Sequence, residues 1–448
     1  MILILFVGSL LLAFIAKKNS LLAIMSPTFW ASGMVAFFSL IYICTYSTML
    51  GDLHLITVVV MLGALLATYF GEYVGCRVVF RKTKTNTKNI TPHFENKTPI
   101  IVSKSKTVIL TVVFTIIGIM RYRSLGAFAS VYAGVGGFKS AMEMMSYARL
   151  GYVQAGTNIS LGGTFANQFV YLCEICAYIY IFIFFYNYLV CKKINLYLLL
   201  PILPDVLIRF VTTTRSAYII LVISIVAAFF SVSQRMGKKW ILFSPKLLKI
   251  VFVFAIVLIW YGRSRNDVSI SMTRYLQMYT CSSLYALDSF LIKNTSNSPY
   301  FGYYTLQSIY SLLRITHDTV PVWNPDVIFG INGAATNIYT CLYDTVNDFG
   351  IVGMLFVKFI EAIISGAIIK RFLNSDVYES KYYVLIYFVV AIEYCYLNFP
   401  IGHAFTGYFG SPDLMLRYLV YCAIIVKLVF MPTINAEGKI RIGRFYIK

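Results

Sequence analysis

The residues with the most specific chemistry in this sequence are arginines at the ends of long apolar runs. The run IVLIWYG, residues 256–262, leads directly into Arg263 and Arg265. A guanidinium is planar and holds a phosphate or carboxylate through two parallel hydrogen bonds, whereas a lysine offers only a point charge. Arginines of this kind predict an anion-binding site, provided that the surrounding elements bring them to one face.

Composition indicates that the elements around these arginines are membrane-spanning helices. The chain has 448 residues, of which 59% are apolar and only 12% are charged, and uncharged runs near 20 residues long recur along it. Runs of that length are needed to cross the hydrocarbon core of a bilayer, and soluble proteins carry about a quarter charged residues. The sequence therefore predicts an all-α, polytopic integral membrane protein with a single membrane domain, 1–448. The net charge of +20 falls mostly in short loops between apolar runs, so it does not indicate nucleic-acid binding.

Eleven spans are predicted. Their approximate ranges are 2–16, 21–45, 54–76, 107–120, 166–190, 194–211, 216–232, 247–262, 346–369, 383–399 and 414–431. With this count the basic stretches at 17–18, 77–106, 192–193, 234–239 and the tail 432–448 all fall on one side, which is then the cytoplasm. We expect the amino terminus to be periplasmic, the carboxyl terminus cytoplasmic, and the first apolar run to be a retained span.

Arginine and lysine are divided unequally by this topology. The predicted inner side holds 6 Arg and 19 Lys, whereas the predicted outer side and the outer ends of spans hold 10 Arg and 3 Lys. Orientation needs only a positive charge, so an excess of arginine outside indicates a second purpose. The predicted anion contacts are Arg215, Arg263, Arg265, Arg274 and Arg314, followed by Arg121, Arg123 and Arg149. The alternative for any one of them is an ion pair with an outer acid such as Asp267 or Asp288 that fastens a loop.

Two predicted periplasmic segments are large, 121–165 and 263–345. The second is long enough to have structure of its own, and short helices are predicted at 273–292 and 304–315, separated by turn-rich pieces. Tyrosine and tryptophan are frequent in it. Aromatic rings suit the faces of sugars, and they equally form belts at membrane interfaces, so both interpretations stay open.

Four carboxylates are predicted within spans, namely Glu174, Asp205, Glu361 and Glu393. Such groups are costly in hydrocarbon, and a transporter could use them for proton coupling. They do not recur in matched halves of the chain, and no internal repeat of the kind found in inverted-repeat transporters is present.

Cysteine and histidine give little support to redox or metal chemistry. Cys173 and Cys176 have redox-motif spacing but fall inside an apolar run, which predicts two buried thiols. Cys281 and Cys341 share the large outer segment and could form a disulfide. The four histidines are dispersed along the sequence, so metal-independent chemistry with no cofactor is predicted.

Two short motifs and the layout of spans resemble a known family. Segment 334–353, AATNIYTCLYDTVNDFGIVG, is followed by a span and resembles the Asp-Phe-Gly signature that closes the large outer loop of bacterial oligosaccharide repeat-unit polymerases, also called O-antigen polymerases. Segment 212–225, TTTRSAYIILVISI, is similar to the Thr/Ser-x-Arg turn that opens a span in that family. The arrangement of spans with one large outer loop in the second half matches along nearly the whole chain.

This resemblance implies a membrane glycosyltransferase of the bacterial inner membrane that acts in lipopolysaccharide or similar polysaccharide biosynthesis. The donor would be a growing glycan on polyprenyl diphosphate, such as undecaprenyl diphosphate, and the acceptor a single repeat unit on a second such lipid. An acceptor hydroxyl attacks the anomeric carbon of the donor, and polyprenyl diphosphate leaves. The implied partners are these lipid-linked glycans, membrane lipids and a chain-length regulator protein.

The implied reaction gives the outer residues their roles. Arginines would stabilise the negative charge on the departing diphosphate in a water-poor site. A general base would take the proton of the acceptor, and the candidates are His317, Asp318, Asp344 and Asp348. Each base candidate also has an ordinary interpretation: a lone loop histidine is often a surface residue, and Asp348 could cap the helix that follows it.

Two other functions remain open. An O-antigen ligase would share the arginine chemistry but would hand the finished chain to a lipid A core or a protein. A flippase or other carrier of lipid-linked oligosaccharides would move its substrate without making a bond.

Overall fold

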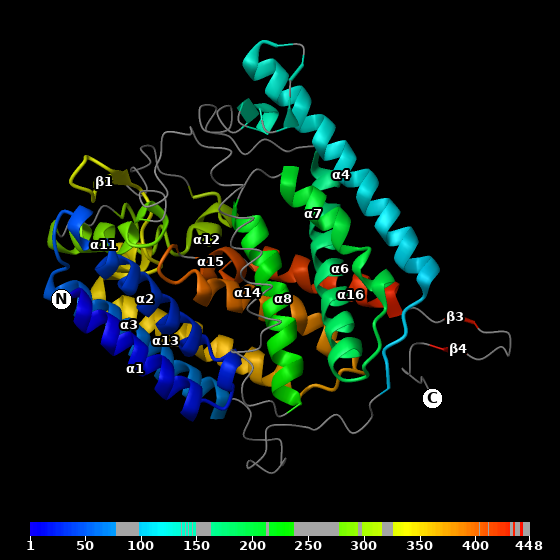
Figure 1. Cartoon of the computed structure of the whole chain (residues 1–448), viewed down its shortest axis with the longest axis horizontal. Coiled ribbons are helices and arrows are strands. Elements are labelled where there is room, and N and C mark those ends of the chain that lie inside the picture. Colours follow the sequence, from blue (N-terminus) through cyan, green and yellow to red (C-terminus); the bar gives the residue numbers. More distant parts are fainter. Residues whose placement is uncertain are drawn as a thin grey trace. The chain divides into compact units, whose positions relative to one another are not determined.

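The computed structural model of the chain is mostly helical in the residues that it describes (Figure 1). It describes all residues except 78–97, 136, 139, 142, 146, 149–162, 212–214, 237–276, 294–297, 316–325, 403, 411, 431–432, 435–439 and 442–448. For 163–165, 215–217, 308, 311, 406, 433–434 and 440–441 it describes the backbone alone.

Eight helices in the described part of the chain are long and apolar enough to cross a membrane. They are α1 (Ile2–Asn19), α2 (Pro27–Cys44), α3 (Leu55–Arg77), α4 (Lys104–Ala133), α6 (Gly163–Leu189), α8 (Arg215–Arg235), α13 (Tyr343–Asn374) and α14 (Ser380–Leu397). Each coincides with a predicted span, so the prediction of an all-α, multi-pass membrane protein is confirmed at these eight places.

The remaining described elements are short. They are η1 (Ala23–Met25), η2 (Tyr46–Thr48), η3 (Leu196–Leu199), α7 (Ile202–Val211), α11 (Ser282–Lys293), α12 (Gln307–Leu312), β1 (Val327–Ile328), β2 (Ala335–Thr336), α15 (Phe405–Phe409), α16 (Pro412–Phe430), β3 (Thr433–Ile434) and β4 (Ile440–Arg441). β1 pairs with β2 and β3 with β4, both antiparallel, with Val327 opposite Thr336 in the first pair. α16 has the length of the predicted span 414–431 but carries three charged residues, Asp413, Arg417 and Lys427.

The chain divides into two compact units. Unit 1 comprises Met1–Ile90, Ile270–Asn374 and Ala391–Leu416, and unit 2 comprises Thr91–Ser269, Ser375–Val390 and Arg417–Lys448.

In unit 1, α3 and α13 pack against each other in parallel (Figure 1). A Cβ atom added to Gly71 would lie 2.2 Å from the carbonyl oxygen of Phe359, and one added to Gly75 would lie 2.2 Å from that of Ile363. The contacts follow the same order along both helices, so the helices run in the same direction. Glycine permits this backbone-to-backbone approach, which is typical of helix pairs in membranes.

The connection between α2 and α3 is joined to the described part of segment 263–345. The backbone N–H of Leu50 donates to the carbonyl of Phe329 at 3.0 Å, and that of Ile331 donates to the carbonyl of Thr48 at 3.2 Å. These bonds place the end of α2, the start of α3 and the β1–β2 hairpin at the same end of unit 1. The sequence predicted this connection and segment 263–345 on one side of the membrane, and the contacts agree.

In unit 2, η3 and α7 run alongside α4 in the same direction. The hydroxyl of Tyr197 in η3 donates to the carbonyl of Val102, just before α4, at 3.2 Å. A Cβ atom added to Gly118 in the middle of α4 would lie 2.9 Å from Leu207 of α7, and the last residue of α7 packs in a cluster with Leu125. The two short elements together therefore follow most of the length of α4.

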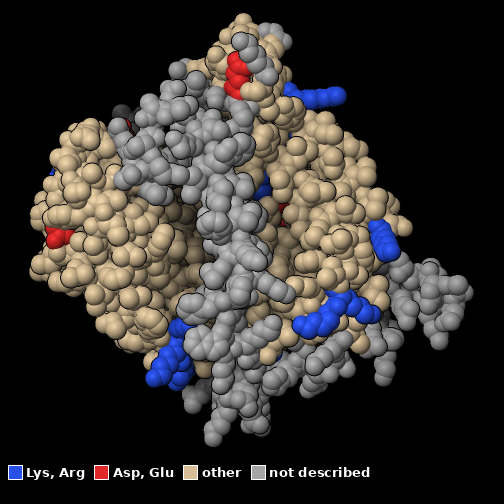
Figure 2. Space-filling model, in the orientation of Figure 1, with Lys and Arg blue, Asp and Glu red and all other residues tan. Residues whose placement is uncertain are grey.

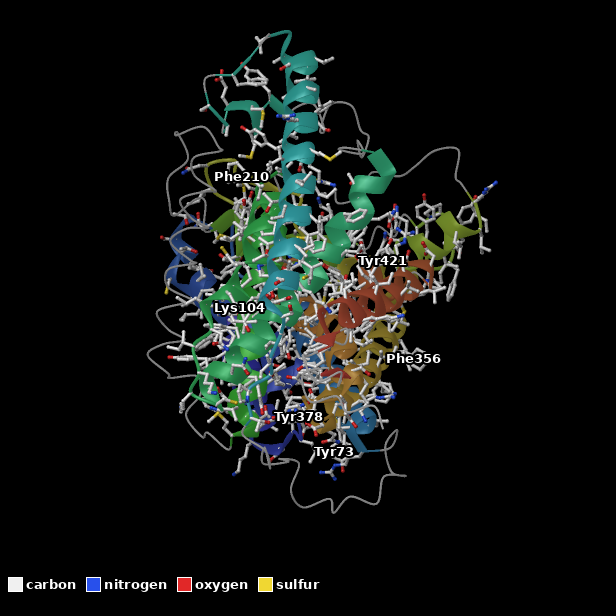
Figure 3. All side chains as sticks on the ribbon, turned by 90° about the vertical axis from the view of Figure 1, so that its right-hand side faces the viewer. Tyr73, Lys104, Phe210, Phe356, Tyr378 and Tyr421 are labelled. Carbon is white, nitrogen blue, oxygen red and sulfur yellow. The ribbon has the colours of Figure 1, made fainter. Side chains whose placement is uncertain are left out.

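The predicted span 194–211 is thus divided into two pieces rather than one long helix. Pro201 and Pro204 lack a backbone N–H, and both are tolerated only near a helix start, which explains why α7 begins between them. In Figure 3, Lys104 marks the start of α4 and Phe210 of α7 lies toward its other end, in agreement with the contacts.

Four helix ends meet at one end of unit 2. Tyr378, two residues before α14, donates from its hydroxyl to the carbonyl of Thr98 at 2.8 Å and shares a hydrogen bond of 2.8 Å with Tyr186 near the end of α6. Arg235, the last residue of α8, donates to the carbonyl of Ser375 at 2.9 Å. The start of α4, the ends of α6 and α8 and the start of α14 therefore lie together, and the sequence predicted all four on one side.

The parallel packing of α3 and α13 limits the number of crossings. Two parallel spanning helices must be separated along the chain by an odd number of crossings. Between them lie α4, α6, the η3–α7 pair and α8, and the predicted span 247–262, which lies outside the described residues, would supply the fifth. The eleven-span prediction places five spans between the two helices, an odd number, and the span count itself stays a prediction.

The surface of the helices carries apolar stripes suited to lipid. Val352, Phe356, Ile360 and Ile364 recur every four residues along α13 and are all exposed. Phe356 is 65% exposed and points away from its helix (Figure 3). Charged side chains are few on the described surface in Figure 2. Exposed apolar stripes of this length indicate contact with lipid tails.

Two native cysteines provide a test of sidedness. Cys44 is exposed at the end of α2 and Cys191 is partly exposed after α6, whereas the other seven cysteines are buried. We expect a membrane-impermeant maleimide to label Cys44 in intact spheroplasts and to reach Cys191 only after permeabilisation, more slowly because burial raises the pKa of the Cys191 thiol. Serine variants of each cysteine assign the two signals. The reverse order of labelling would contradict the predicted orientation.

Candidate functional site

The predicted site residues fall into three groups. His317, Arg149, Arg263, Arg265 and Arg274 lie outside the described residues, as does Asp318. Arg215 begins α8, but its side chain is among those not described. The described residues are Asp344, Asp348 and Arg314 in unit 1, and Arg121 and Arg123 in unit 2.

Asp348, in the Asn-Asp-Phe-Gly segment, fastens the turn that precedes α12. Its Oδ1 accepts hydrogen bonds from the Ser298 hydroxyl at 2.6 Å and the Tyr304 N–H at 3.3 Å, and its Oδ2 accepts from the Thr305 N–H at 2.6 Å. Two residues later, Gly350 has φ 67° and ψ −177°, which kinks α13. Asp348 therefore fixes the segment 298–305 rather than capping the part of α13 that follows Gly350. Its two oxygens already accept hydrogen bonds from three donors.

Asp344 lies beneath the surface in the first turn of α13. Further along α13, the ammonium of Lys358 donates to Glu361 Oε2 at 2.9 Å, and both side chains are buried. The pKa of the nearby Cys341 thiol is raised to about 12, mainly by burial. Lys358 lowers this pKa, whereas Glu361 and Asp344 raise it. Asp344 thus belongs to a buried charged region, a less suitable place than a surface for meeting a sugar hydroxyl.

Arg314 lies two residues after the end of α12 and has an unusual backbone conformation. Its φ is 56°, in the left-handed region that favours glycine, and the N–H of Ile315 donates to the carbonyl of Tyr310 at 3.0 Å. This is the hydrogen bond of a Schellman motif, in which the left-handed residue is usually glycine. The side chain of Arg314 is exposed. An exposed guanidinium at a position where glycine is favoured supports a role for its charge.

We expect Arg314→Gly to raise the free energy of unfolding by about 1 kcal/mol, because the strain of the left-handed residue is removed. The same variant should lower the rate of the proposed glycosyl transfer at least about tenfold, less than the hundredfold typical of a buried donor. Denaturant unfolding and an activity assay on one preparation check both effects. Arg314→Lys keeps the left-handed strain, so its stability should not change, and it serves as the control for the unfolding measurement. Unchanged activity in Arg314→Gly would exclude the predicted anion contact.

Arg121 and Arg123 lie on helix α4 and differ in burial. The predicted span ended at 120, but α4 continues to Ala133, so both arginines are helical rather than in a loop. Arg121 is buried and donates from Nη1 to Asn167 Oδ1 of α6, whereas Arg123 is exposed. Arg121 therefore helps to join α4 to α6, and Arg123 faces outward.

One face of α6 carries a polar stripe. Asn167, Tyr171, Glu174 and Tyr178 are separated by four, three and four residues, which places them on the same side of the helix. The hydroxyl of Tyr178 donates to Oε1 of Glu174. Polar residues on one face of a membrane helix are expected to face other protein rather than lipid, and here α4 and α7 supply the partners.

Arg209 of α7 meets this stripe in a buried ion network. Its Nε donates to Asp205 Oδ2 at 2.6 Å, and its Nη2 donates to Glu174 Oε1 at 3.3 Å and to the Tyr178 hydroxyl at 3.2 Å. The Arg209 side chain is 5% exposed. One guanidinium thus faces two carboxylates, and the opposite charges compensate one another.

Tyrosines of α14 and α16 extend the stripe. The ring of Tyr418 stacks on Tyr387 with centroids 4.2 Å apart and meets Tyr171 edge-on at 5.5 Å. The hydroxyl of Tyr421, which lies on α16 (Figure 3), donates to Gln168 Oε1. Unit 2 therefore combines guanidinium, carboxylate and aromatic groups in one region. Such a combination is suited to binding sugars and anions, and equally to joining helices.

Only part of this network was identified from the sequence, and its contacts were not predicted. Glu174 and Asp205 were identified only as carboxylates within spans, and Arg209 was not among the predicted anion contacts. The signal that could have found the pair is the spacing of Asp205 and Arg209, four residues apart on one helix. No comparable signal links Glu174, 35 residues away along the chain.

The structure describes all four cysteines for which the sequence suggested a redox pair or a disulfide. Cys173 and Cys176 are buried free thiols inside α6, as predicted. Cys281 and Cys341 are also free, so the disulfide considered for them is not formed. Within the described residues, no group of three or more His, Cys, Asp and Glu side chains could hold a metal ion.

Comparison of the chain with protein-family models, with curated proteins and with solved structures finds no match.

Proposed function

We propose that the protein is a membrane glycosyltransferase that polymerises polyprenyl-diphosphate-linked oligosaccharide repeat units at the outer face of the bacterial inner membrane. The growing glycan is transferred from its lipid to the incoming unit, and polyprenyl diphosphate is released. The product is an O-antigen or a similar surface polysaccharide.

The observation that carries the proposal is the distribution of basic residues. On the predicted outer side arginine exceeds lysine by 10 to 3, whereas on the inner side lysine exceeds arginine by 19 to 6. Orientation requires no such preference, but recognition of a diphosphate by paired hydrogen bonds does. Two lipid-linked substrates bring two diphosphates, so more than one cluster of arginines is expected.

The helix contacts support this assignment of segments to an outer and an inner side. Thr48 and Leu50 of unit 1 bond to segment 263–345, which would hold four of the outer arginines. In unit 2 the helix ends next to the predicted basic segments lie together, at the end where Arg235 and Tyr378 lie. Arg121 and Arg209 lie on helix turns beyond the middle of α4 and α7, away from that end.

The reaction assigns different tasks to the side chains. Arginines hold the leaving diphosphate and stabilise its charge as the bond to the anomeric carbon breaks, and each such donor is worth on the order of a hundredfold in rate. Tyrosine rings in segment 263–345 provide surfaces on which sugars stack.

A deletion strain tests this function. Loss of a polymerase leaves surface glycans with a single repeat unit attached to the lipid core. Loss of a ligase leaves the core bare, and loss of a flippase stops delivery of units to the outer face. We expect the single-unit pattern, with long chains restored by the wild-type gene. A bare core in the deletion strain would contradict the proposal in favour of a ligase or a flippase.

A further inference from the structure

A pocket of about 230 Å³ lies at the end of unit 1 where α2 ends and α3 begins. Its lining includes Asp52, His54, Tyr285, Asp288, Ser289 and Lys293, from the α2–α3 connection and from α11. The volume is below the roughly 300 to 1,000 Å³ of pockets for drug-sized ligands, and so suits one terminal sugar ring rather than a whole oligosaccharide.

His54 and Asp288 form a hydrogen-bonded pair in this pocket, 234 residues apart in the sequence. His54 Nδ1 lies 2.9 Å from Asp288 Oδ2. The carboxylate can only accept, so the proton of the imidazole resides on Nδ1 and Nε2 presents its lone pair. The Asp288 side chain is 3% exposed and the His54 side chain 62% exposed. A buried carboxylate thus orients an imidazole whose second nitrogen is open to a ligand, the arrangement of a general base.

Asp288 also has a structural task, which does not account for the imidazole. Its Oδ1 accepts from the backbone N–H of His54 at 2.8 Å and from the Thr57 hydroxyl at 2.6 Å, and so satisfies donors at the start of α3. Any residue at position 54 could supply the backbone N–H. The Nδ1 bond is additional, and Nε2 forms no hydrogen bond with any of the described residues.

The surrounding groups suit a polyhydroxyl ligand. Burial, and next the Asp288 carboxylate, raise the pKa of the Tyr285 phenol, so that it remains a hydrogen-bond donor at neutral pH. Ser289 adds a hydroxyl and Lys293 a cation, whereas the Asp52 carboxylate already accepts from the amino terminus and from the N–H groups of Ile2 and Leu53. The pocket therefore offers donors and acceptors around the imidazole, as recognition of a sugar requires.

We propose that His54 is the general base of the glycosyl transfer and that Asp288 is its positioning residue, an inference that rests on the proposed function. The proton of the acceptor hydroxyl passes to Nε2 of His54 as the hydroxyl oxygen bonds to the anomeric carbon of the donor. The bond from that carbon to the phosphate oxygen breaks, and its electron pair leaves with polyprenyl diphosphate. The imidazolium then releases the proton to water.

The test uses the purified full-length protein in liposomes with synthetic single repeat units on polyprenyl diphosphate. His54→Gln should lower the rate of chain extension at least about a hundredfold, because an amide cannot take the proton. The protein should remain folded with only a small fall in melting temperature, since Asp288 keeps its bonds to the backbone N–H of His54 and to the Thr57 hydroxyl. Added imidazole should restore part of the activity of His54→Ala.

Two further variants separate positioning from structure. Asp288→Asn should lower kcat with little change in KM, because the imidazole loses its orientation while the pocket remains. Thr57→Val removes another bond to the same carboxylate and should leave kcat unchanged. Equal effects of the two variants on kcat would mean that Asp288 acts only through the helix start, and would overturn its assignment.

The outcomes distinguish the two proposals. If wild-type protein extends the glycans and His54→Gln does so at a similar rate, His54 is not the base, and the proposed function stands. If wild-type protein leaves the glycans unchanged, the proposed function fails, and the assignment of His54 fails with it.

Discussion

Replacing Arg209 with methionine is expected to lower the free energy of unfolding by about 3 to 5 kcal/mol. The guanidinium compensates Asp205 and Glu174 within a buried network, at distances of 2.6 and 3.3 Å. Methionine fills a similar volume but leaves two carboxylates without a cation in a region that water does not easily reach. Removing one partner of a buried pair is costly because the other charge remains. Denaturant unfolding in detergent, followed by circular dichroism, measures the loss.

Removing the carboxylates together with the cation should reverse much of this effect. A triple variant of Arg209→Met, Asp205→Leu and Glu174→Gln should be more stable than Arg209→Met alone. Arg123→Met, on the exposed side of α4, is the matched control and should change stability by less than about 0.5 kcal/mol. A loss below about 1 kcal/mol in Arg209→Met would contradict the assignment of a buried, charged network.

The second large effect concerns activity. Arg215→Lys and Arg265→Lys should each lower chain growth about a hundredfold, while the protein level and the membrane topology stay unchanged. Lysine keeps the positive charge but loses the planar pair of donors that a diphosphate engages. The length distribution of surface glycans in a complemented deletion strain is the measurement.

Arg77→Lys is the matched control for these variants. Arg77 ends α3 on the predicted inner side, where its guanidinium lies over the ring of Tyr73, 4.2 Å from the ring centroid. Since a positive charge suffices there, chain growth should remain normal. Normal chain growth in both Arg215→Lys and Arg265→Lys would show that these two side chains have no role beyond orientation or loop structure.

Most of the helices could be predicted from the sequence because hydrocarbon imposes a minimum length. Apolar runs such as 2–16 and 54–76 coincide with α1 and α3 within a few residues. The end of α4 was not predictable in this way, since Arg121 and Arg123 interrupt the apolar run but not the helix. α4 ends instead at Gly134, whose φ of 64° suits a left-handed helix end.

The candidate site could be predicted less well, because its contacts join distant segments. Asp205 and Arg209 share a helix face, which the sequence reveals, but Arg121 and Asn167 meet only through the packing of α4 on α6. The histidines looked dispersed because sequence distance was the only measure, and folding then placed His54 beside a carboxylate. Asp348 is the opposite case: its motif was recognised, but its hydrogen bonds show a structural task.

The most direct test of the proposed function is the reconstitution of purified wild-type protein with a single lipid-linked repeat unit as the only substrate. We predict a ladder of longer glycans, each on one polyprenyl diphosphate, with one free polyprenyl diphosphate released for every bond formed. Unchanged glycans in protein that remains folded would contradict the proposal that this chain is a polymerase.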